Sequence, residues 1–266
     1  MSPATLQVDD LAVTFRTRQG PVPAVRGVSY AIGPGERVGM AGESGCGKTV
    51  SALAITGLLP PTAEVAGRVR FQGRDVGGPS SRERRALRGR HVGTIFQDPL
   101  SSLNPALTVG YQIAEPLRAH LRCDGATARR RGIDLLQRVG IPEPERNFDE
   151  YPHRFSGGMR QRAVIAIALS CEPQLIVADE PTTALDVTIQ AQILELLVAL
   201  CDERGTALLL ITHDLGVLAG VAQRILVMHD GRLVEQAAVD DLFYRPVHPY
   251  TRALLASVPS LPGGSR

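Results

Sequence analysis

Aromatic residues, cysteines and long apolar runs are all scarce in this chain of 266 residues. It has no tryptophan and only 4% aromatic residues, which argues against a surface that stacks single-stranded nucleic acid or sugars. The four cysteines, Cys46, Cys123, Cys171 and Cys201, show no C-x-x-C spacing, so neither a zinc knuckle nor a disulfide framework is predicted. No apolar run reaches the roughly 18 residues that a membrane span needs, and the acidic N-terminal segment lacks a signal-peptide core. We therefore expect a soluble chain in a reducing compartment.

Lysine is the scarcest of the charged residues. Of the 29 basic residues, 28 are arginine and a single one, Lys48, is lysine. Arginine enrichment is typical of a GC-rich genome, but it does not explain why the exception lies in a glycine-rich loop. Lysine is a compact point charge and arginine a wide planar fork, so the two are not equivalent phosphate ligands. The net charge of +2 is too balanced for a nucleic-acid arm or a polybasic membrane patch.

The order of apolar and polar segments predicts an α/β fold. Alternating apolar residues indicate strands at the N-terminus, and short apolar runs indicate further strands later in the chain. The segment 99–154 has a helical and polar pattern instead, and Asp230-Gly231 predicts a hairpin turn. The expected strands cover residues 6–8, 11–15, 25–32, 37–41, 69–71, 91–96, 175–178, 207–212, 224–228 and 233–234. We expect a mostly parallel sheet, an N-terminal antiparallel element and an inserted helical subdomain.

Residues 42–49 match the P-loop pattern G-x-x-x-x-G-K-[ST], which predicts a P-loop NTPase core. Glycines in such a loop let backbone N–H groups wrap phosphates at a helix N-terminus, where the helix dipole favours negative charge. Lys48 is expected to reach the β- and γ-phosphates, and the Thr49 hydroxyl to ligate Mg²⁺. The expected nucleotide contacts are Gly42, Glu43, Ser44, Gly45, Cys46, Gly47, Lys48, Thr49 and Val50.

Two adjacent carboxylates follow the apolar strand at 175–178. We expect Asp179 to hold Mg²⁺ through water and Glu180 to polarise the attacking water. Adjacent carboxylates at a strand end are otherwise an ordinary helix cap or a solvated pair, but the P-loop favours the catalytic interpretation. A GTPase of the Ras type is excluded, because it needs a lysine in its guanine-reading loop and Lys48 is the only lysine in the chain.

Ser156-Gly157-Gly158 stands just before a predicted helix, and the acidic strand follows that helix. Together with the P-loop, this segment resembles the signature motif in the nucleotide-binding subunit of an ABC transporter. The resemblance implies that the amides of residues 156–158 bind the γ-phosphate of an ATP held by the opposing subunit. A monomer should then be nearly inactive.

The same resemblance implies roles for four further residues. Phe15 is similar to the aromatic residue that stacks on adenine, with a strand-core role as the alternative. Gln97 resembles the glutamine that touches Mg²⁺ or water, and Asp186 lies in the loop that crosses the dimer interface. His213 resembles the histidine that hydrogen-bonds the γ-phosphate and orients Glu180, and a structural role is its alternative.

The resemblance covers residues 6–259 and narrows to one branch of the family. Segments 158–162, 182–192 and 243–251 are similar to the oligopeptide, dipeptide and nickel import ATPases, most closely to the first of that branch's two paralogues. Met159 replaces the glutamine of the general signature, as is common in this branch. Many peptide importers continue into a cysteine-bearing C-terminal extension; because the sequence stops at Arg266, we expect that this extension is missing or was cut off. A missing extension favours an importer of nickel or a metallophore, and a peptide importer remains the other alternative.

One ABC ATPase domain over residues 1–266 is implied. Its nucleotide-binding core is expected at 1–97 and 163–240, the helical subdomain with the signature at 98–162, and a short C-terminal extension at 241–266. Such a subunit hydrolyses ATP with Mg²⁺ at the cytoplasmic face of the inner membrane. Its expected partners are two permease subunits, a second paralogous ATPase and, indirectly, an extracytoplasmic substrate-binding protein, but no nucleic acid. The alternative is a soluble ABC ATPase acting on nucleic acid or ribosomes, against which the lack of sustained heptads and of a second cassette argues.

Overall fold

The computed structural model of the chain describes residues 3–78, 81–98, 102–183 and 185–257. Its contacts divide the chain into two compact units. Unit 1 consists of Met1–Arg85 and Ala207–Arg266, and unit 2 of Ala86–Thr206. This division differs from the predicted one, in which the helical subdomain covers residues 98–162, and the predicted boundaries stay a prediction.

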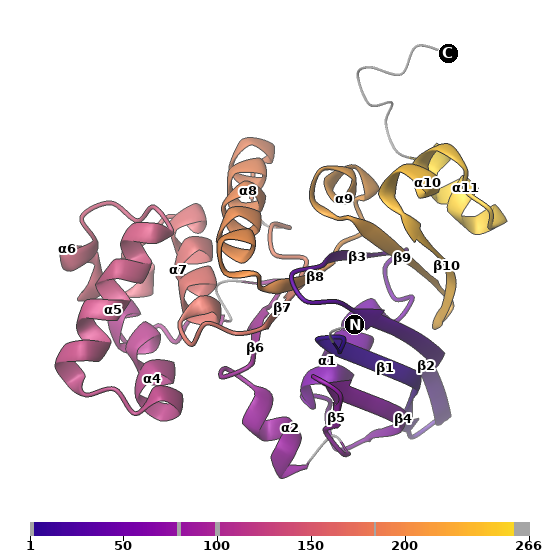
Figure 1. Cartoon of the computed structure of the whole chain (residues 1–266), viewed down its shortest axis with the longest axis horizontal. Coiled ribbons are helices and arrows are strands. Elements are labelled where there is room, and N and C mark those ends of the chain that lie inside the picture. The colour runs from indigo at the N-terminus through magenta and orange to yellow at the C-terminus, as the bar shows by residue number, and fades with distance from the viewer. Residues whose placement is uncertain (1–2, 79–80, 99–101, 184, 258–266) are drawn as a thin grey trace. The chain divides into compact units, whose positions relative to one another are not determined.

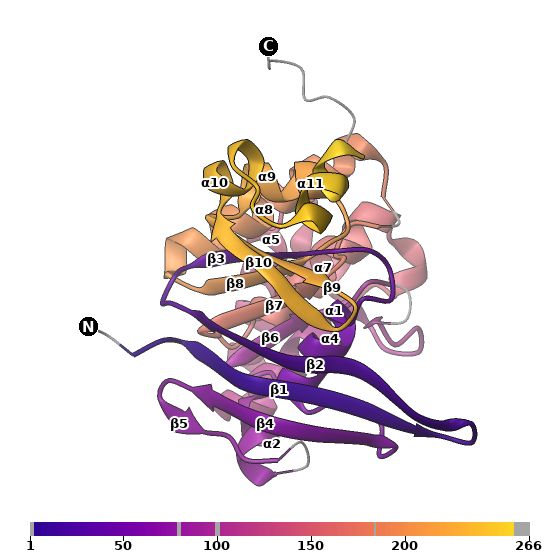
Figure 2. The ribbon, with the colours of Figure 1, turned by 90° about the vertical axis from the view of Figure 1, so that its right-hand side faces the viewer.

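An antiparallel sheet forms the first part of unit 1 (Figures 1 and 2). Its order is β2-β1-β4-β5, and the strands are β1 Leu6–Thr17, β2 Gly20–Ile32, β4 Ala63–Phe71 and β5 Arg74–Asp75. Strand β1 runs through the polar interruption at Asp9 and Asp10, because Asp10 adopts φ +49° and absorbs a register shift against β4. Leu6, Leu11 and Val13 are fully buried, so the alternating pattern in the sequence identifies the core face of this sheet.

The second part of unit 1 is a mostly parallel set of strands. Strand β3 (Arg37–Ala41) pairs in parallel with β8 (Ala207–Ile211) and with β9 (Arg224–His229). The predicted hairpin at Asp230-Gly231 is confirmed, since β10 (Arg232–Ala238) pairs antiparallel with β9. The helices of this part are α1 Lys48–Thr56, α9 Leu215–Val221, α10 Val239–Tyr244 and α11 Pro249–Ala256, and α2 Arg82–Leu87 lies at the boundary of the unit.

Unit 2 consists of two parallel strands and a group of helices. Strand β6 (Val92–Ile95) pairs with β7 (Leu175–Asp179), and every residue of β7 is buried, as its unbroken apolar run predicts. The helices are α4 Val109–Leu121, α5 Gly125–Arg138, α6 Pro144–Phe148, the 3₁₀ turn Pro152–Arg154, α7 Gly157–Leu169 and α8 Val187–Arg204. The α/β fold class and the helical segment inserted between β6 and β7 are therefore confirmed.

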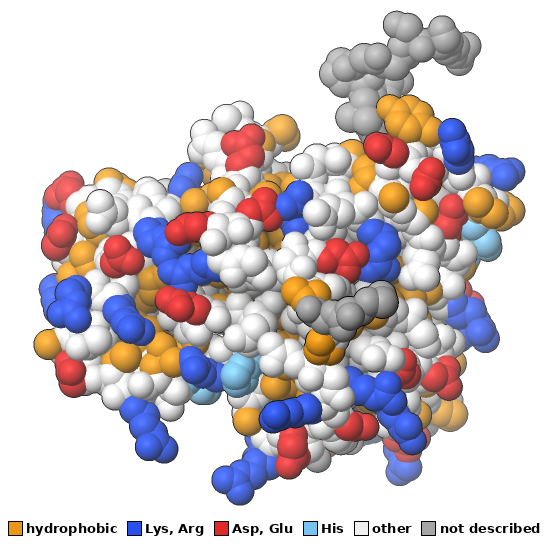
Figure 3. All heavy atoms as spheres, viewed as in Figure 1, with side chains coloured by type: hydrophobic (Ala, Val, Ile, Leu, Met, Phe, Trp, Pro, Cys, Tyr) orange, Lys and Arg blue, Asp and Glu red, His pale blue; other side chains and the backbone are white. Residues whose placement is uncertain are grey.

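Two properties of the surface bear on function. Acidic and basic side chains are interspersed on the face that Figure 3 shows, in keeping with the net charge of +2. Among the described residues, no helix is both long enough and apolar enough to cross a membrane.

Candidate nucleotide site

The predicted phosphate loop connects the end of β3 to the start of α1 in unit 1. Gly42, Gly45 and Gly47 have φ angles of +149°, +80° and +105°, a region that residues with a Cβ atom rarely adopt. A Cβ atom at Gly42 would lie 2.2 Å from the carbonyl oxygen of Met228, and one at Gly47 would lie 2.5 Å from that of Ala24. Backbone conformation and close packing therefore both require glycine in this loop.

Lys48 is buried inside the loop, with 5% of its surface exposed. Its ammonium donates hydrogen bonds to the carbonyl oxygens of Gly42 at 2.7 Å and Glu43 at 2.8 Å. Thr49, the next residue, is exposed, so its hydroxyl is accessible to a ligand. The first turn of α1 contains no acidic residue, which leaves the positive end of the helix dipole for an anion. The loop thus has the chemistry of a phosphate cradle.

Residues distant in sequence brace this loop. The backbone N–H of Gly231, in the β9–β10 turn, donates to the Cys46 carbonyl oxygen at 3.0 Å. The backbone N–H of Glu43 donates to the Tyr250 hydroxyl at 3.1 Å. Burial raises the pKa of the Cys46 thiol, although nearby Lys48 opposes the shift, so the thiol stays protonated at neutral pH. Neither residue is predicted from the sequence as a neighbour of the phosphate loop: Gly231 is predicted only as part of the hairpin turn, and the only signal for Tyr250 is the similarity of segment 243–251 to the import ATPases.

The predicted acidic residues lie at the end of β7 in unit 2. Asp179 is buried, and Glu180 adopts φ +46°, a conformation that a residue other than glycine holds only where its surroundings enforce it. The Glu180 carboxylate accepts hydrogen bonds on Oε2 from the Gln97 amide at 3.1 Å and from the Thr183 hydroxyl at 2.8 Å. Gln97, predicted to touch Mg²⁺ or water, and Glu180, predicted to polarise the attacking water, are therefore in direct contact. Thr183 is a partner that the sequence analysis missed.

The predicted signature motif begins helix α7 of unit 2. Ser156 is its N-cap, and its hydroxyl accepts the N–H of Met159 at 3.3 Å. Ser156 and Gly157 are exposed, and α7 has no acidic residue in its first turn, so this helix start also presents free positive potential. Asp186 caps α8 in the same way, with its carboxylate accepting the N–H of Ile189 at 3.0 Å. Capping of α8 is the role that the structure shows for Asp186, and its role at a dimer interface stays a prediction. Ala184, two residues earlier in the same loop, lies outside the described residues.

The last two predicted residues, Phe15 and His213, belong to unit 1. Phe15 is half-buried in β1 opposite Val22 and Ala63, and His213 is exposed just after β8. Either position leaves a ring that a ligand can reach. Their assigned roles toward adenine and the γ-phosphate stay predictions.

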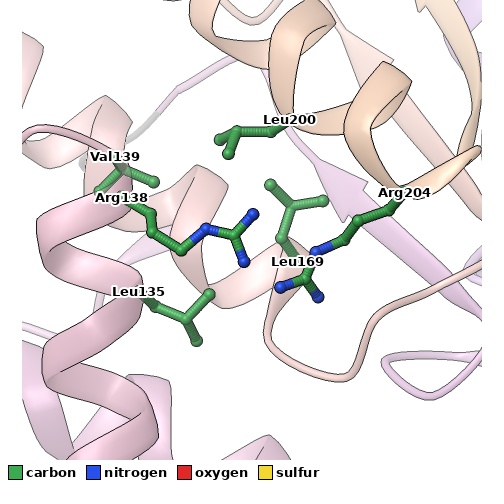
Figure 4. Close-up of a pocket in the computed structure, with 6 residues that line it drawn as sticks. All are labelled: Leu135, Arg138, Val139, Leu169, Leu200 and Arg204. Atoms are coloured by element: carbon green, nitrogen blue, oxygen red, sulfur yellow. The ribbon is translucent and has the colours of Figure 1, made fainter.

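A separate apolar depression in unit 2 contains none of the predicted residues (Figure 4). It lies where helices α5, α7 and α8 meet and is lined by Leu135, Arg138, Val139, Leu169, Leu200 and Arg204. Both arginines are engaged in ion pairs, Arg138 with Glu203 at 2.5 Å and Arg204 with Glu172 at 2.9 Å. This depression is a packing seam, and the polar loop and strand ends described above are the better candidate for chemistry.

Comparison with known proteins gives two family-model matches. The ABC transporter family matches residues 25–183, and the oligopeptide/dipeptide transporter C-terminal region matches residues 234–266. Among solved structures, a dimeric bacterial ABC transporter cassette is 30% identical, with a TM-score of 0.78 over 88% of this chain and 98% of that one. An ATP-binding cassette bound to ADP and Pi is 29% identical, with a TM-score of 0.77 over the same shares of the two chains.

Curated relatives agree with these matches. The probable peptide ABC transporter ATP-binding protein y4tR of Sinorhizobium fredii is 54% identical over 96% of this chain and 76% of its own length. The dipeptide transport ATP-binding protein DppD of Escherichia coli is 51% identical over 96% of this chain and 79% of its own. The oligopeptide transport ATP-binding protein OppD of Mycobacterium tuberculosis is 54% identical over 98% of this chain, which spans only 43% of that relative.

Proposed function

The chain belongs to the ABC transporter family, and on that basis we propose that it is the ATP-hydrolysing subunit of an importer for dipeptides or oligopeptides. The observation that carries this proposal is the glycine cradle that holds the buried Lys48 ammonium at the N-terminus of α1. A loop of this kind binds polyphosphate and serves a chemistry in which positioning and charge stabilisation do most of the work.

ATP is the substrate, and each candidate residue has a role toward it. Lys48, whose ammonium is held by the carbonyl oxygens of Gly42 and Glu43, binds the phosphates together with the N–H groups of residues 44–50. Phe15 stacks on adenine. The exposed Thr49 hydroxyl, the buried Asp179 carboxylate and the Gln97 amide offer the oxygen ligands that Mg²⁺ prefers. When bound, Mg²⁺ supplies charge neutralisation at the phosphates.

The carboxylate of Glu180 acts as the base toward the attacking water. Hydrogen bonds from Gln97 and Thr183 fix its orientation, and His213 hydrogen-bonds the γ-phosphate. The exposed start of α7 at Ser156–Gly158 binds the nucleotide of an opposing subunit, and Asp186 lies at that interface. Because the signature acts on the partner's nucleotide, hydrolysis requires a dimer.

Peptides are a better-supported cargo than nickel or a metallophore. The match at residues 234–266 is to an oligopeptide/dipeptide transporter region, and the relatives described above carry peptide, oligopeptide or dipeptide names. Nothing in these comparisons favours the alternative of a soluble ATPase acting on nucleic acid or ribosomes.

The proposed assembly contains two permeases that carry the transport path, with this subunit peripheral at the cytoplasmic face of the membrane. A second, paralogous ATPase completes the dimer, and an extracytoplasmic binding protein delivers the cargo. Isolated from the permeases, the chain loses the high effective concentration that holds the two ATPases together and is expected to be mostly monomeric.

Reconstitution tests this function. The chain and its proposed permease partners are placed in vesicles with the binding protein, with and without the paralogous ATPase. We expect ATP hydrolysis stimulated by binding protein loaded with dipeptide or oligopeptide, and only in the presence of both ATPases. Stimulation by nickel alone would reassign the cargo, and full transport-coupled hydrolysis without the paralogue would refute the heterodimer.

A further inference from the structure

A single peptide unit of the phosphate loop, the one joining Gly42 to Glu43, is held from both of its ends. Its carbonyl oxygen accepts the Lys48 ammonium at 2.7 Å, and its N–H donates to the Tyr250 hydroxyl at 3.1 Å. Because a trans peptide is planar, its N–H and C=O point in opposite directions and share one rotation. Fixing the N–H therefore also fixes the direction of the carbonyl that holds Lys48.

Tyr250 is itself held in place by unit 1. It lies in the first turn of α11, and its ring packs against the His229 ring, with centroids 3.9 Å apart and planes inclined by 30°. Burial is the largest influence on the Tyr250 hydroxyl and raises its pKa, so the group is neutral at neutral pH. A neutral hydroxyl has lone pairs to accept the Glu43 N–H.

The start of α11 is anchored by Glu235 of β10. Its carboxylate accepts the backbone N–H of Val247 at 2.8 Å and that of His248 at 2.9 Å. Burial works to raise the pKa of the Glu235 carboxyl, but the nearby Thr251 hydroxyl and the hydrogen bonds from these two N–H groups outweigh it, with help from the charge of His248. The net pKa lies below the ordinary value. The position of Tyr250 is thus set by charge-assisted bonds as well as by ring packing.

We propose that Tyr250 is a positioning residue for nucleotide binding, which acts through the Gly42–Glu43 peptide on the Lys48 ammonium. The inference rests on the proposed ATPase function and extends its site to a helix 207 residues away in sequence. It also assigns a task to the C-terminal segment that includes Glu235 and Tyr250: tuning the affinity for ATP.

The test compares ATP binding to the purified 266-residue chain by calorimetry for Tyr250→Phe and Tyr244→Phe. The first change removes only the hydroxyl and keeps a ring against His229, whereas Tyr244 is 82% exposed and serves as the matched control. We expect Tyr250→Phe to weaken ATP binding by about threefold to tenfold, the effect of one hydrogen bond, and Tyr244→Phe to match the parent. In the reconstituted complex, KM for ATP should rise by the same factor while kcat stays within about twofold of the parent.

Several outcomes would overturn this role. One is a dissociation constant for Tyr250→Phe that is equal to or below that of the parent. Another is a lower melting temperature without any change in affinity, as expected if the tyrosine only stabilises α11. Tyr250→Ala gives an independent reading: if alanine weakens binding and phenylalanine does not, ring packing and not the hydroxyl is responsible. A parent chain that binds no ATP would instead contradict the proposed function itself.

Discussion

Replacing Glu180 with glutamine separates nucleotide binding from hydrolysis. Gln97 and Thr183 both donate hydrogen bonds to Oε2 of the carboxylate, and a glutamine side chain of the same size still offers an oxygen to accept them. The unusual backbone at φ +46° needs no adjustment, because side-chain size and branching are unchanged. We therefore expect fold and ATP affinity to match the parent within about twofold.

What glutamine lacks is basicity. A positioned general base contributes about 10²- to 10⁴-fold to rate, which corresponds to roughly 3–5 kcal/mol of barrier. We expect Glu180→Gln to lower ATP turnover in the reconstituted complex at least about a hundredfold and to trap the ATP-bound dimer. Glu172→Gln is the matched control, since Glu172 also has a positive φ (+52°) but forms an ion pair with Arg204. Hydrolysis by Glu180→Gln at the parental rate would refute the assignment of Glu180 as the base.

Three further changes test other parts of the structure. Lys48→Arg places a wide guanidinium in a loop whose carbonyl oxygens lie 2.7 and 2.8 Å from the present ammonium, so ATP affinity measured by calorimetry should fall at least about tenfold. An affinity within about twofold of the parent would show that charge alone suffices. Arg84→Met removes the buried guanidinium that donates to the Ala54 and Gly77 carbonyl oxygens, each at 2.7 Å, and should lower the free energy of unfolding by about 3 kcal/mol in denaturant titration. An unchanged free energy of unfolding would contradict this role. The depressed pKa of the Glu235 carboxyl contributes stability that is complete above the ordinary 4.5 and is lost as pH falls below it. Protection of the amides at the start of α11 from hydrogen exchange, taken relative to the intrinsic exchange rate at each pH, should therefore decrease there, and Glu235→Gln should abolish that dependence.

Much of the site could be predicted because its signals are local. The glycine spacing of the phosphate loop and the two acids after an apolar strand are encoded within a few residues, and the Asp230-Gly231 turn likewise predicts its own hairpin. The contact of Gln97 with Glu180 joins residues 83 apart, and it follows from parallel pairing of β6 with β7, which brings their carboxyl ends to one edge. The sequence motifs predicted the roles of Gln97 and Glu180 separately, but not that the two side chains are in contact.

Other features depend on tertiary contacts that have no local signal. Tyr250 reaches the phosphate loop only because β10 and its anchor at Glu235 direct α11 there, and no periodicity in segment 243–251 indicates it. The polar pair Asp9-Asp10 predicts a break between two strands, yet β1 continues through both residues. Pairing on both sides, with β2 and with β4, outweighs the low strand propensity of aspartate.

The division of unit 1 into two separated stretches of sequence has a consequence for biosynthesis. Strand β3, from which the phosphate loop departs, has its two neighbours in β8 and β9, which the ribosome makes only after the whole of unit 2. At a synthesis rate of about 5–20 residues per second, both edges of β3 remain unpaired for roughly 10 to 30 s before β8 and β9 are made. Unit 2 is continuous and has all of its own strands and helices by then. The nascent chain can therefore acquire its inserted unit first, and the strand that leads into the phosphate loop is completed only by residues made after that unit.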